Sequence, residues 1–298
     1  MRITCTGPGS HLGRGGGRAM GPLALGALGV AASIAHGQEA MYTEAATMPS
    51  PGTYVLREQL TFFKYGLHPH RGTESTEETT WENSLTAGIA RGWAVRLTAP
   101  VTWRRDAPGS GFPGGEDTRD QGVENLDIQF KWRFYQSDTG GIDTLRAALL
   151  FGASVPSGDD HDFSESTVNP MIGAVLTNVW GRHGFNQDLM YHFNTGGDMA
   201  GNFGGDGPDD AVRFNSAYLY RIAPSRYTED TTGAWYVTAE INGLYETGGD
   251  TELRFSPGVM FEGREFGFEI MGQLPLWHDL KDRGELDLAI GVGVRFLF

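Results

Sequence analysis

The sequence has almost no cysteine. Cys5 is the only one among 298 residues. A disulfide within the chain needs two thiols and a cysteine-rich metal site needs several, so both are excluded. Cys5 also lies in an N-terminal segment that we expect to be removed, which leaves no thiol for catalysis in the mature chain.

Basic residues are scarce as well. The chain has 23 Lys and Arg against 37 Asp and Glu, a formal charge of −14. Residues 1–37 contain three Arg and no acid, so their removal leaves 20 basic and 37 acidic residues and a charge of −17. Proteins that bind nucleic acid are expected to carry a basic surface, so we exclude nucleic acid as a partner.

Long apolar runs are missing after residue 37. No later segment contains about 18 uninterrupted apolar residues, which argues against a helical membrane protein. The strands of a membrane β-barrel show alternation and no such runs, so this absence does not exclude that class.

The first 37 residues have the architecture of a secretory signal peptide. Three arginines provide positive charge, and residues 20–35 form an apolar stretch of small residues and Leu. Small residues at Ala35 and Gly37 fit cleavage before residue 38. A non-cleaved anchor is the alternative. The expected organisation is a signal peptide at 1–37, a periplasmic lead-in at 38–52 and an outer-membrane β-barrel at 53–298.

The final residues, 285–298 (ELDLAIGVGVRFLF), alternate between large apolar side chains and mostly small or charged ones. Successive side chains of a strand point to opposite faces, so one face here is continuously apolar. A chain that ends on Phe298 suits the closing strand of a transmembrane barrel. A sheet-ending strand in a soluble sandwich is the alternative.

The same alternation recurs along the chain. In residues 124–135, five large apolar side chains lie opposite Asp127, Gln129, Lys131 and Arg133. The pattern predicts twelve strands, an even number as in single-chain bacterial barrels. The predicted strands are 53–65, 80–90, 93–104, 124–135, 142–155, 171–180, 185–194, 211–222, 234–246, 252–262, 266–277 and 285–298. The facing of residues 171–180 is ambiguous.

Connections between the predicted strands alternate in length. Every second connection is short in four cases out of five, as at residues 91–92, whereas most of the others are longer. Outer-membrane barrels have short periplasmic turns and long external loops. We therefore predict an all-β fold, an up-and-down antiparallel transmembrane β-barrel in the bacterial outer membrane with both termini in the periplasm.

Several short motifs resemble those of the phenol-degradation meta-pathway (MetA-like) family of outer-membrane transporters. They are residues 155–159 (VPSGD), 253–258 (LRFSPG), 273–275 (QLP) and 291–298 (GVGVRFLF). The resemblance implies a monomeric barrel channel for the passive passage of small solutes, including aromatic or hydrophobic ones. Gly293, Phe296 and Phe298 also resemble the carboxy-terminal signal that the barrel-assembly machinery reads.

Charged side chains on the face opposite the apolar one are candidates to line the lumen. Rings of charge tune which solutes pass through a channel. The alternative is that these charges pair across strands and fill the lumen, since a twelve-stranded barrel lies between filled eight-stranded and open sixteen-stranded ones. A plugged structural or surface-interaction barrel is therefore the second hypothesis. The candidates are Arg96, Arg104, Asp127, Lys131, Arg133, Arg146, Glu240, Arg254 and Glu269.

No motif supports a metal site, a cofactor or an enzyme. Residues 159–162 (DDHD) and 206–210 (DGPDD) are acidic, but a solvated loop explains both because their spacing matches no calcium loop. Only His192 falls within a predicted strand and no GxSxG motif is present, so a barrel enzyme is a third hypothesis without a supporting motif. The expected partners are outer-membrane lipid and lipopolysaccharide, the barrel-assembly machinery and a small-molecule solute.

Overall fold

The fold was analysed in a computed structural model. It describes residues 38–66, 73–108, 117–157, 163–164, 167–196, 209–281 and 283–298. The expected signal peptide, 1–37, lies outside the described residues. No helix in the described part of the chain is long and apolar enough to cross a membrane.

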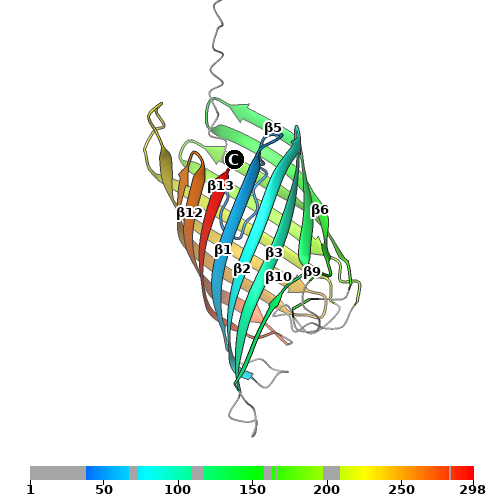
Figure 1. Ribbon diagram of the computed structural model, residues 1–298. Coiled ribbons are helices and arrows are strands. Elements are labelled where there is room, and N and C mark those ends of the chain that lie inside the picture. The colour runs from blue at the N-terminus through cyan, green and yellow to red at the C-terminus, as the bar shows by residue number, and fades with distance from the viewer. Residues whose placement is uncertain are drawn as a thin grey trace, which may run out of the picture. The chain divides into compact units, whose positions relative to one another are not determined.

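The described chain is built from strands joined by turns and loops (Figure 1). Every neighbouring pair of strands is antiparallel. The strands are β1 (Tyr54–Tyr65), β2 (Thr73–Ala90), β3 (Trp93–Pro108), β4 (Thr118–Val123), β5 (Leu126–Thr139), β6 (Asp143–Val155), β7 (Asn169–Trp180), β8 (His183–His192), β9 (Ala211–Ala223), β10 (Gly233–Glu246), β11 (Thr251–Gly263), β12 (Phe266–Asp279) and β13 (Leu286–Leu297).

These strands close into a barrel with twelve positions in its wall. β4 and β5 pair with successive parts of β3 and together occupy one position. The ring closes where β1 pairs with β13, from Val55 opposite Leu297 to Tyr65 opposite Leu286. Beyond this ladder, the Tyr54 amide donates to the Phe298 carbonyl oxygen at 2.7 Å. The predicted closed antiparallel barrel and its closing strand are confirmed.

The two ends of the barrel differ in their connections. One end, here called the turn end, holds Phe298 and the tight turns at residues 91–92, 181–182 and 264–265. At the opposite end, the loop end, successive strands are further apart in sequence, as between Tyr65 of β1 and Thr73 of β2 and between His192 of β8 and Ala211 of β9. A longer connection at residues 224–232 also lies at the turn end, as the sequence predicted for this position.

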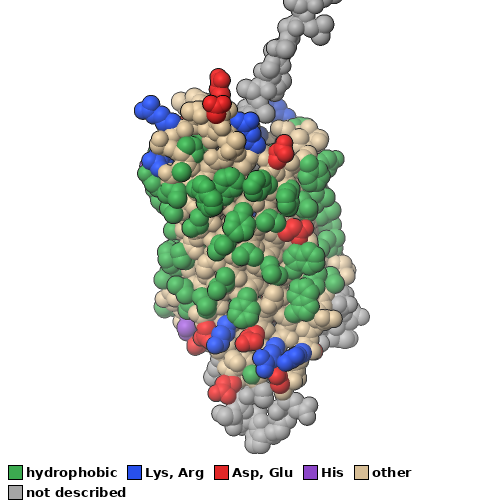
Figure 2. Space-filling model, turned by 60° about the vertical axis from the view of Figure 1, so that its left-hand side comes forward, with side chains coloured by type: hydrophobic (Ala, Val, Ile, Leu, Met, Phe, Trp, Pro, Cys, Tyr) green, Lys and Arg blue, Asp and Glu red, His purple; other side chains and the backbone are tan. Residues whose placement is uncertain are grey.

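Large apolar side chains cover the outside of the wall. Figure 2 shows them as a band, with charged side chains gathered mainly beyond its two edges. Trp180, Trp235 and Phe266 are exposed near the turn end, and Trp103 and Trp277 near the loop end. A band of this kind between aromatic girdles is what a bilayer requires of a barrel. The fold is that of a transmembrane β-barrel.

β7 has apolar side chains on both of its faces, which explains its ambiguous pattern. Ile172 and Leu176 are exposed on the outside, with 52% and 38% of their surface accessible. Met171 and Val175 are buried on the inside, where they pack in a cluster with Ala46. Alternation is lost because the inner face of this strand also contacts apolar groups.

Most predicted strand bounds differ from the structure by a few residues, and two departures are larger. β2 begins at Thr73 instead of residue 80, and β4 lies within the loop predicted before residue 124. Both extensions are polar, Thr73–Thr79 reading TESTEET and β4 reading TRDQGV. Apolar alternation marks only the part of a strand that crosses hydrocarbon, so polar extensions beyond it carry no such signal.

Candidate functional site

Residues 38–50, here called the plug, lie inside the barrel. Most of them are buried, including Ala40, Thr43, Ala45 and Ala46 at 1% exposure or less. Their partners are inward side chains of strands on all sides of the wall, from Arg57 on β1 to Glu240 on β10. The sequence led us to expect a lead-in preceding the barrel at 38–52, whereas most of this segment occupies its lumen. The contacts lie in the half of the lumen next to the turn end.

The plug joins β1 through a tight turn at the barrel wall. Thr53 donates its backbone amide to the Ser50 carbonyl oxygen at 3.0 Å, and Gly52 donates to Gly88 of β2 at 2.9 Å. Gly88 must lack a side chain here, because a Cβ atom would lie 2.1 Å from the Ser50 oxygen. Gly52 has φ of 80°, a conformation that glycine adopts without strain. The point where the plug leaves the lumen is therefore fixed.

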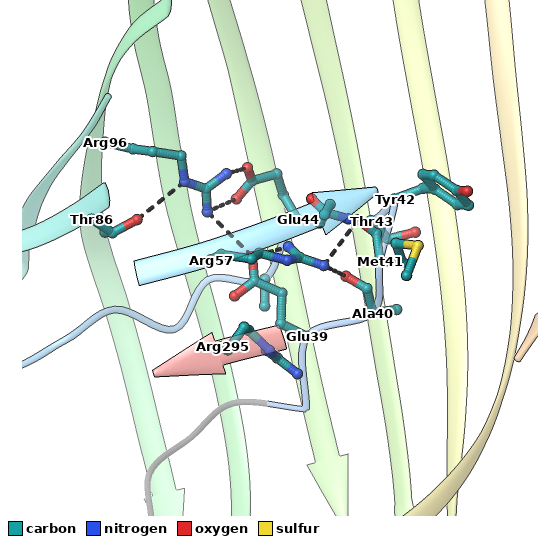
Figure 3. A network of polar contacts seen from close by, with 12 residues as sticks. Glu39, Ala40, Met41, Tyr42, Thr43, Glu44, Arg57, Thr86, Arg96 and Arg295 are labelled. Carbon is teal, nitrogen blue, oxygen red and sulfur yellow. Dashed lines mark hydrogen bonds and ion pairs between the residues drawn. The ribbon is translucent and has the colours of Figure 1, made fainter. Parts of the chain in front are cut away.

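The carboxylate of Glu44 is held by two cations of the wall, of which Figure 3 shows Arg96. Arg96 of β3 forms an ion pair with it through Nη1, and its Nη2 lies 3.2 Å from Oε2. Lys131 of β5 donates from Nζ to Oε2 at 2.8 Å and to the Ala45 carbonyl oxygen at 2.7 Å. Burial raises the pKa of the Glu44 carboxyl, but Arg96 and Lys131 overcome that effect and lower it to about 2. Glu44 is therefore charged at neutral pH.

A second carboxylate of the plug extends this network. Glu39 Oε1 lies 3.3 Å from Arg96 Nη2 and 3.7 Å from Arg57 Nη1. Arg57 also donates to Glu269 of β12 at 2.8 Å and to the carbonyl oxygens of Ala40 and Met41, each at 3.0 Å. Arg57 therefore links the plug to an acid of the wall.

The backbone of the plug is held by polar groups of the wall. Glu240 accepts from the Thr43 hydroxyl at 2.5 Å and from the Tyr42 amide at 3.3 Å. The amide of Glu44 donates to Asp188 of β8 at 2.7 Å. The amide of Ala46 donates to the Thr177 hydroxyl at 2.8 Å. These bonds satisfy backbone groups that form no strand ladder, as buried polar groups require.

Small apolar side chains of the plug fill two pockets of the inner wall. Ala46 packs with a cluster that includes Leu150 of β6 and Met171 of β7. Ala40 packs with Leu219 of β9 and Tyr236 of β10, beside a residue of the 224–232 connection, Tyr227. The plug buries few large apolar groups, so most of its specific contacts are polar.

A cavity of about 540 Å³ occupies the loop-end half of the lumen. Tyr42 of the plug forms part of its lining. The remaining lining is mostly polar and charged, with a few aromatic residues. Among the lining residues are Phe63, Tyr65, Glu78, Glu82, Arg104, Glu124, Asp127, Phe163, His192, Arg213, Glu246, Glu252, Arg254 and Arg283.

The charges of this cavity are unevenly distributed around the barrel. Glu78 and Glu82 of β2, Glu124 before β5 and Asp127 of β5 gather on one side. Arg213 of β9 and Arg254 of β11 come from strands on the opposite side of the ring. Arg104 of β3 lies on the first side too, and Glu246 and Glu252 lie beside the guanidinium groups of the second. A solute in the cavity would therefore meet charges of both signs, with carboxylates in excess near β2 and β5.

The fold is shared with known outer-membrane proteins. An outer-membrane channel from Pseudomonas putida F1 aligns with a TM-score of 0.55 and 12% identity, covering 85% of this chain and 97% of that one. The β domain of the Bordetella autotransporter BrkA aligns with a TM-score of 0.47 and 12% identity, covering 83% and 99%. Neither protein-family models nor curated protein sequences yield a match. At this identity, the likeness to the channel shows the fold alone.

The nine predicted lumen residues fall into three groups. Arg96, Lys131, Glu240 and Glu269 are in the network around the plug. Arg104, Asp127 and Arg254 line the cavity. Arg146 is buried and lies 3.3 Å from Asp138, and Arg133 is half-buried on the same strand as Lys131.

Three charged side chains that form the ion pairs of the plug were not predicted, namely Glu39, Glu44 and Arg57. Arg57 falls between outward residues of the first predicted strand, so its inward position could have been found from alternation. Glu39 and Glu44 lie in a segment without periodicity, and no sequence signal places them in the lumen. Their partners are distant in sequence, as Arg96 is from Glu44.

The predicted assembly residues lie on β13 and at the end of the chain. Phe296 and Phe298 are exposed on the outside, and the Phe298 ring stacks on Tyr54 with centroids 5.8 Å apart. Gly293 faces inward, where an added Cβ would lie 2.8 Å from a Glu269 oxygen.

The acidic loops are largely undescribed. Residues 159–162 and 206–208 lie outside the described residues, and Asp210 accepts from the Tyr191 hydroxyl at 2.6 Å. Among the side chains that the structure describes, no group of three or more His, Cys, Asp or Glu could hold a metal ion.

Proposed function

We propose that this protein is an outer-membrane channel that passes small solutes when the plug leaves its place in the lumen. One observation carries the proposal: the turn-end half of the lumen is occupied by a chain segment held mainly through polar contacts. The loop-end half holds a cavity of about 540 Å³. Passage is thus interrupted by the plug and not by the wall itself.

The nature of the contacts favours a displaceable plug over a permanent core. Buried ion pairs contribute little net free energy, because the attraction between the charges is offset by the loss of their hydration. Arg96, Lys131 and Glu44 can regain that hydration when water enters the lumen. A permanently filled barrel would be better stabilised by large apolar side chains, of which the plug has few. A plugged structural barrel without transport is the alternative.

The solutes are expected to be polar or charged. The lining of the cavity is rich in carboxylates and guanidinium groups, which fit such solutes better than the hydrophobic ones implied by the MetA-like family. Membership of that family, with a monomeric barrel, remains part of the proposal and is supported by the fold and the motifs. We also propose periplasmic termini, supported by the short connections at the turn end. Transport is favoured over hydrolysis because His192 faces the cavity and not the lipid.

Locking the plug should abolish conductance. The side-chain oxygens of Thr43 and Glu240 lie 2.5 Å apart, so Thr43→Cys with Glu240→Cys brings two thiols within reach of a short reducible crosslinker. The mature chain contains no other thiol if Cys5 is removed with the signal peptide. In planar bilayers we expect the crosslinked protein to lose current and the reduced protein to recover it.

The matched control carries only Thr43→Cys, treated with the same reagent, and should keep its current. A crosslinked double variant that conducts like the reduced one would contradict a pathway through the lumen. If the wild-type protein and the reduced variant both fail to conduct, the plugged structural barrel is the better explanation.

Loss of the last side chain should impair assembly in cells. We propose that Gly293, Phe296 and Phe298 are read by the barrel-assembly machinery. Phe298→Ala should then reduce the amount of folded protein in outer membranes several-fold, measured as the band that shifts on heating before electrophoresis. Phe266→Ala, also at the outer turn end, is the control. Equal folding of both purified variants into vesicles would assign the defect to recognition, whereas equal amounts in cells would refute the proposed signal.

A further inference from the structure

Arg96 and Lys131 depend on the plug for all their ion pairs within the described part of the chain. Arg96 pairs with Glu39 and Glu44, and Lys131 pairs with Glu44. Both side chains come from the wall, on β3 and β5, and both are largely removed from solvent, with 18% and 6% of their side-chain surface exposed.

Several other cations of the barrel have acids outside the plug as partners. Arg57 pairs with Glu269 at 2.8 Å, and Arg254 pairs with Glu252 at 2.6 Å. Arg146 lies 3.3 Å from Asp138. These pairs persist when the plug leaves. Arg96 and Lys131 would instead face the lumen without an ion-pair partner, next to each other on strands that pair through Ala94 and Lys131. The wall acids Glu82 and Asp188 interact with them electrostatically but form no ion pair with either.

We infer that Arg96 and Lys131 form a binding site for the carboxylate groups of a permeating solute, and that the plug occupies this site with its own carboxylates. The inference rests on the proposed channel function. Glu44 presents one carboxylate to both cations in the way a solute would. An arginine fork and a lysine ammonium are suited to such a group, because both donate charge-assisted hydrogen bonds.

The geometry favours a short dicarboxylate. A single nitrogen of Arg96, Nη2, lies 3.3 Å from Glu39 Oε1 and 3.2 Å from Glu44 Oε2. Two carboxylates therefore approach one guanidinium group closely enough for a single small molecule to supply both (Figure 3). Arg57 lies beside the Glu39 carboxylate at 3.7 Å and adds positive charge at that end. Succinate has the required two groups on a short chain.

Direct binding tests the site without relying on conductance. Equilibrium dialysis of labelled succinate would compare the folded wild-type protein with Glu39→Gln/Glu44→Gln, which keeps the plug but removes its charges. We expect the double variant to bind succinate at least about tenfold more tightly, because the internal competitor is weakened. Adding Lys131→Met to the double variant should return its affinity for succinate to about that of the wild type.

Glu265→Gln, in the turn between β11 and β12, is the matched control and should bind like the wild type. Equal affinity of the wild type and the double variant for succinate would overturn the site. So would equal binding of succinate and its neutral diamide by the double variant.

Planar-bilayer recordings separate this inference from the proposed function. Succinate should increase the time that the wild-type channel spends open, and its diamide should not. Conductance without any response to succinate would refute the site while leaving the channel in place. Tight succinate binding by the double variant without conductance in any variant would refute the channel and retain the site.

Discussion

Deletion of residues 38–48 should raise the time-averaged current per channel in planar bilayers by about fivefold or more, since a twelve-stranded barrel without its filling is wide enough for water and solutes. The plug occupies the turn-end half of the lumen, where Glu44, Thr43 and Ala46 contact wall residues from four different strands. Its removal joins the loop-end cavity to the turn end. The deletion keeps residues 49–52, so the contact of Ser50 with Gly88 and the start of β1 are preserved.

The deletion is informative only if the barrel still folds. Resistance to denaturation by detergent before heating, together with the circular dichroism of a β-sheet, would establish that. A folded deletion variant whose time-averaged current per channel equals that of the wild type would show that the plug does not obstruct the pathway.

Replacing Ile270 by Arg should destabilise the barrel by about 2–4 kcal/mol, the cost of a basic side chain at the middle of the lipid-facing surface. Ile270 is 47% exposed and lies on the outer face of β12, between Val259 of β11 and Val292 of β13. Neither of these strand partners is acidic, so an arginine at position 270 would have no carboxylate opposite it. Denaturant titration in lipid vesicles measures the free energy of unfolding of the wild type and the variant, and the difference between them is the cost of the substitution.

Phe266→Arg is the matched control for that substitution. Phe266 lies on the same face of the same strand but at its turn-end limit, and is 50% exposed. Near the membrane interface the cost should fall to about 0–1 kcal/mol. Equal costs at the two positions would show that this face does not lie across a bilayer.

The sequence was sufficient for the wall of the barrel, because a bilayer imposes a pattern that can be read residue by residue. β5 shows this most clearly, with Ile128, Phe130 and Trp132 outward and Asp127 and Lys131 inward. The pairing of β1 with β13, which closes the barrel, could also be predicted, because an unpaired edge strand in hydrocarbon would leave backbone groups without hydrogen bonds. Residues Thr73–Thr79 form part of β2 beyond the apolar band. They show no alternation of apolar side chains, so the sequence did not predict this part of the strand.

Only the wall residues of the candidate site could be predicted in the same way. Inward charges such as Arg96 and Lys131 were identified because alternation assigns them to a face. Their partners were not, since the position of Glu44 depends on contacts with side chains that are distant in sequence and on no periodic pattern. The apolar inner face of β7 was the one visible sign, because Met171 and Val175 needed a partner inside the lumen.

The joint between the plug and β1 has a kinetic consequence. Pro51 and Gly52 tether the plug next to its own binding site, so Glu44 acts as a ligand at an effective concentration on the order of millimolar or more. A solute that is much more dilute than this would add little to the fraction of channels that are open. Closure after the solute has left is a first-order return of the tethered segment, and its rate should not depend on how much solute or protein is present.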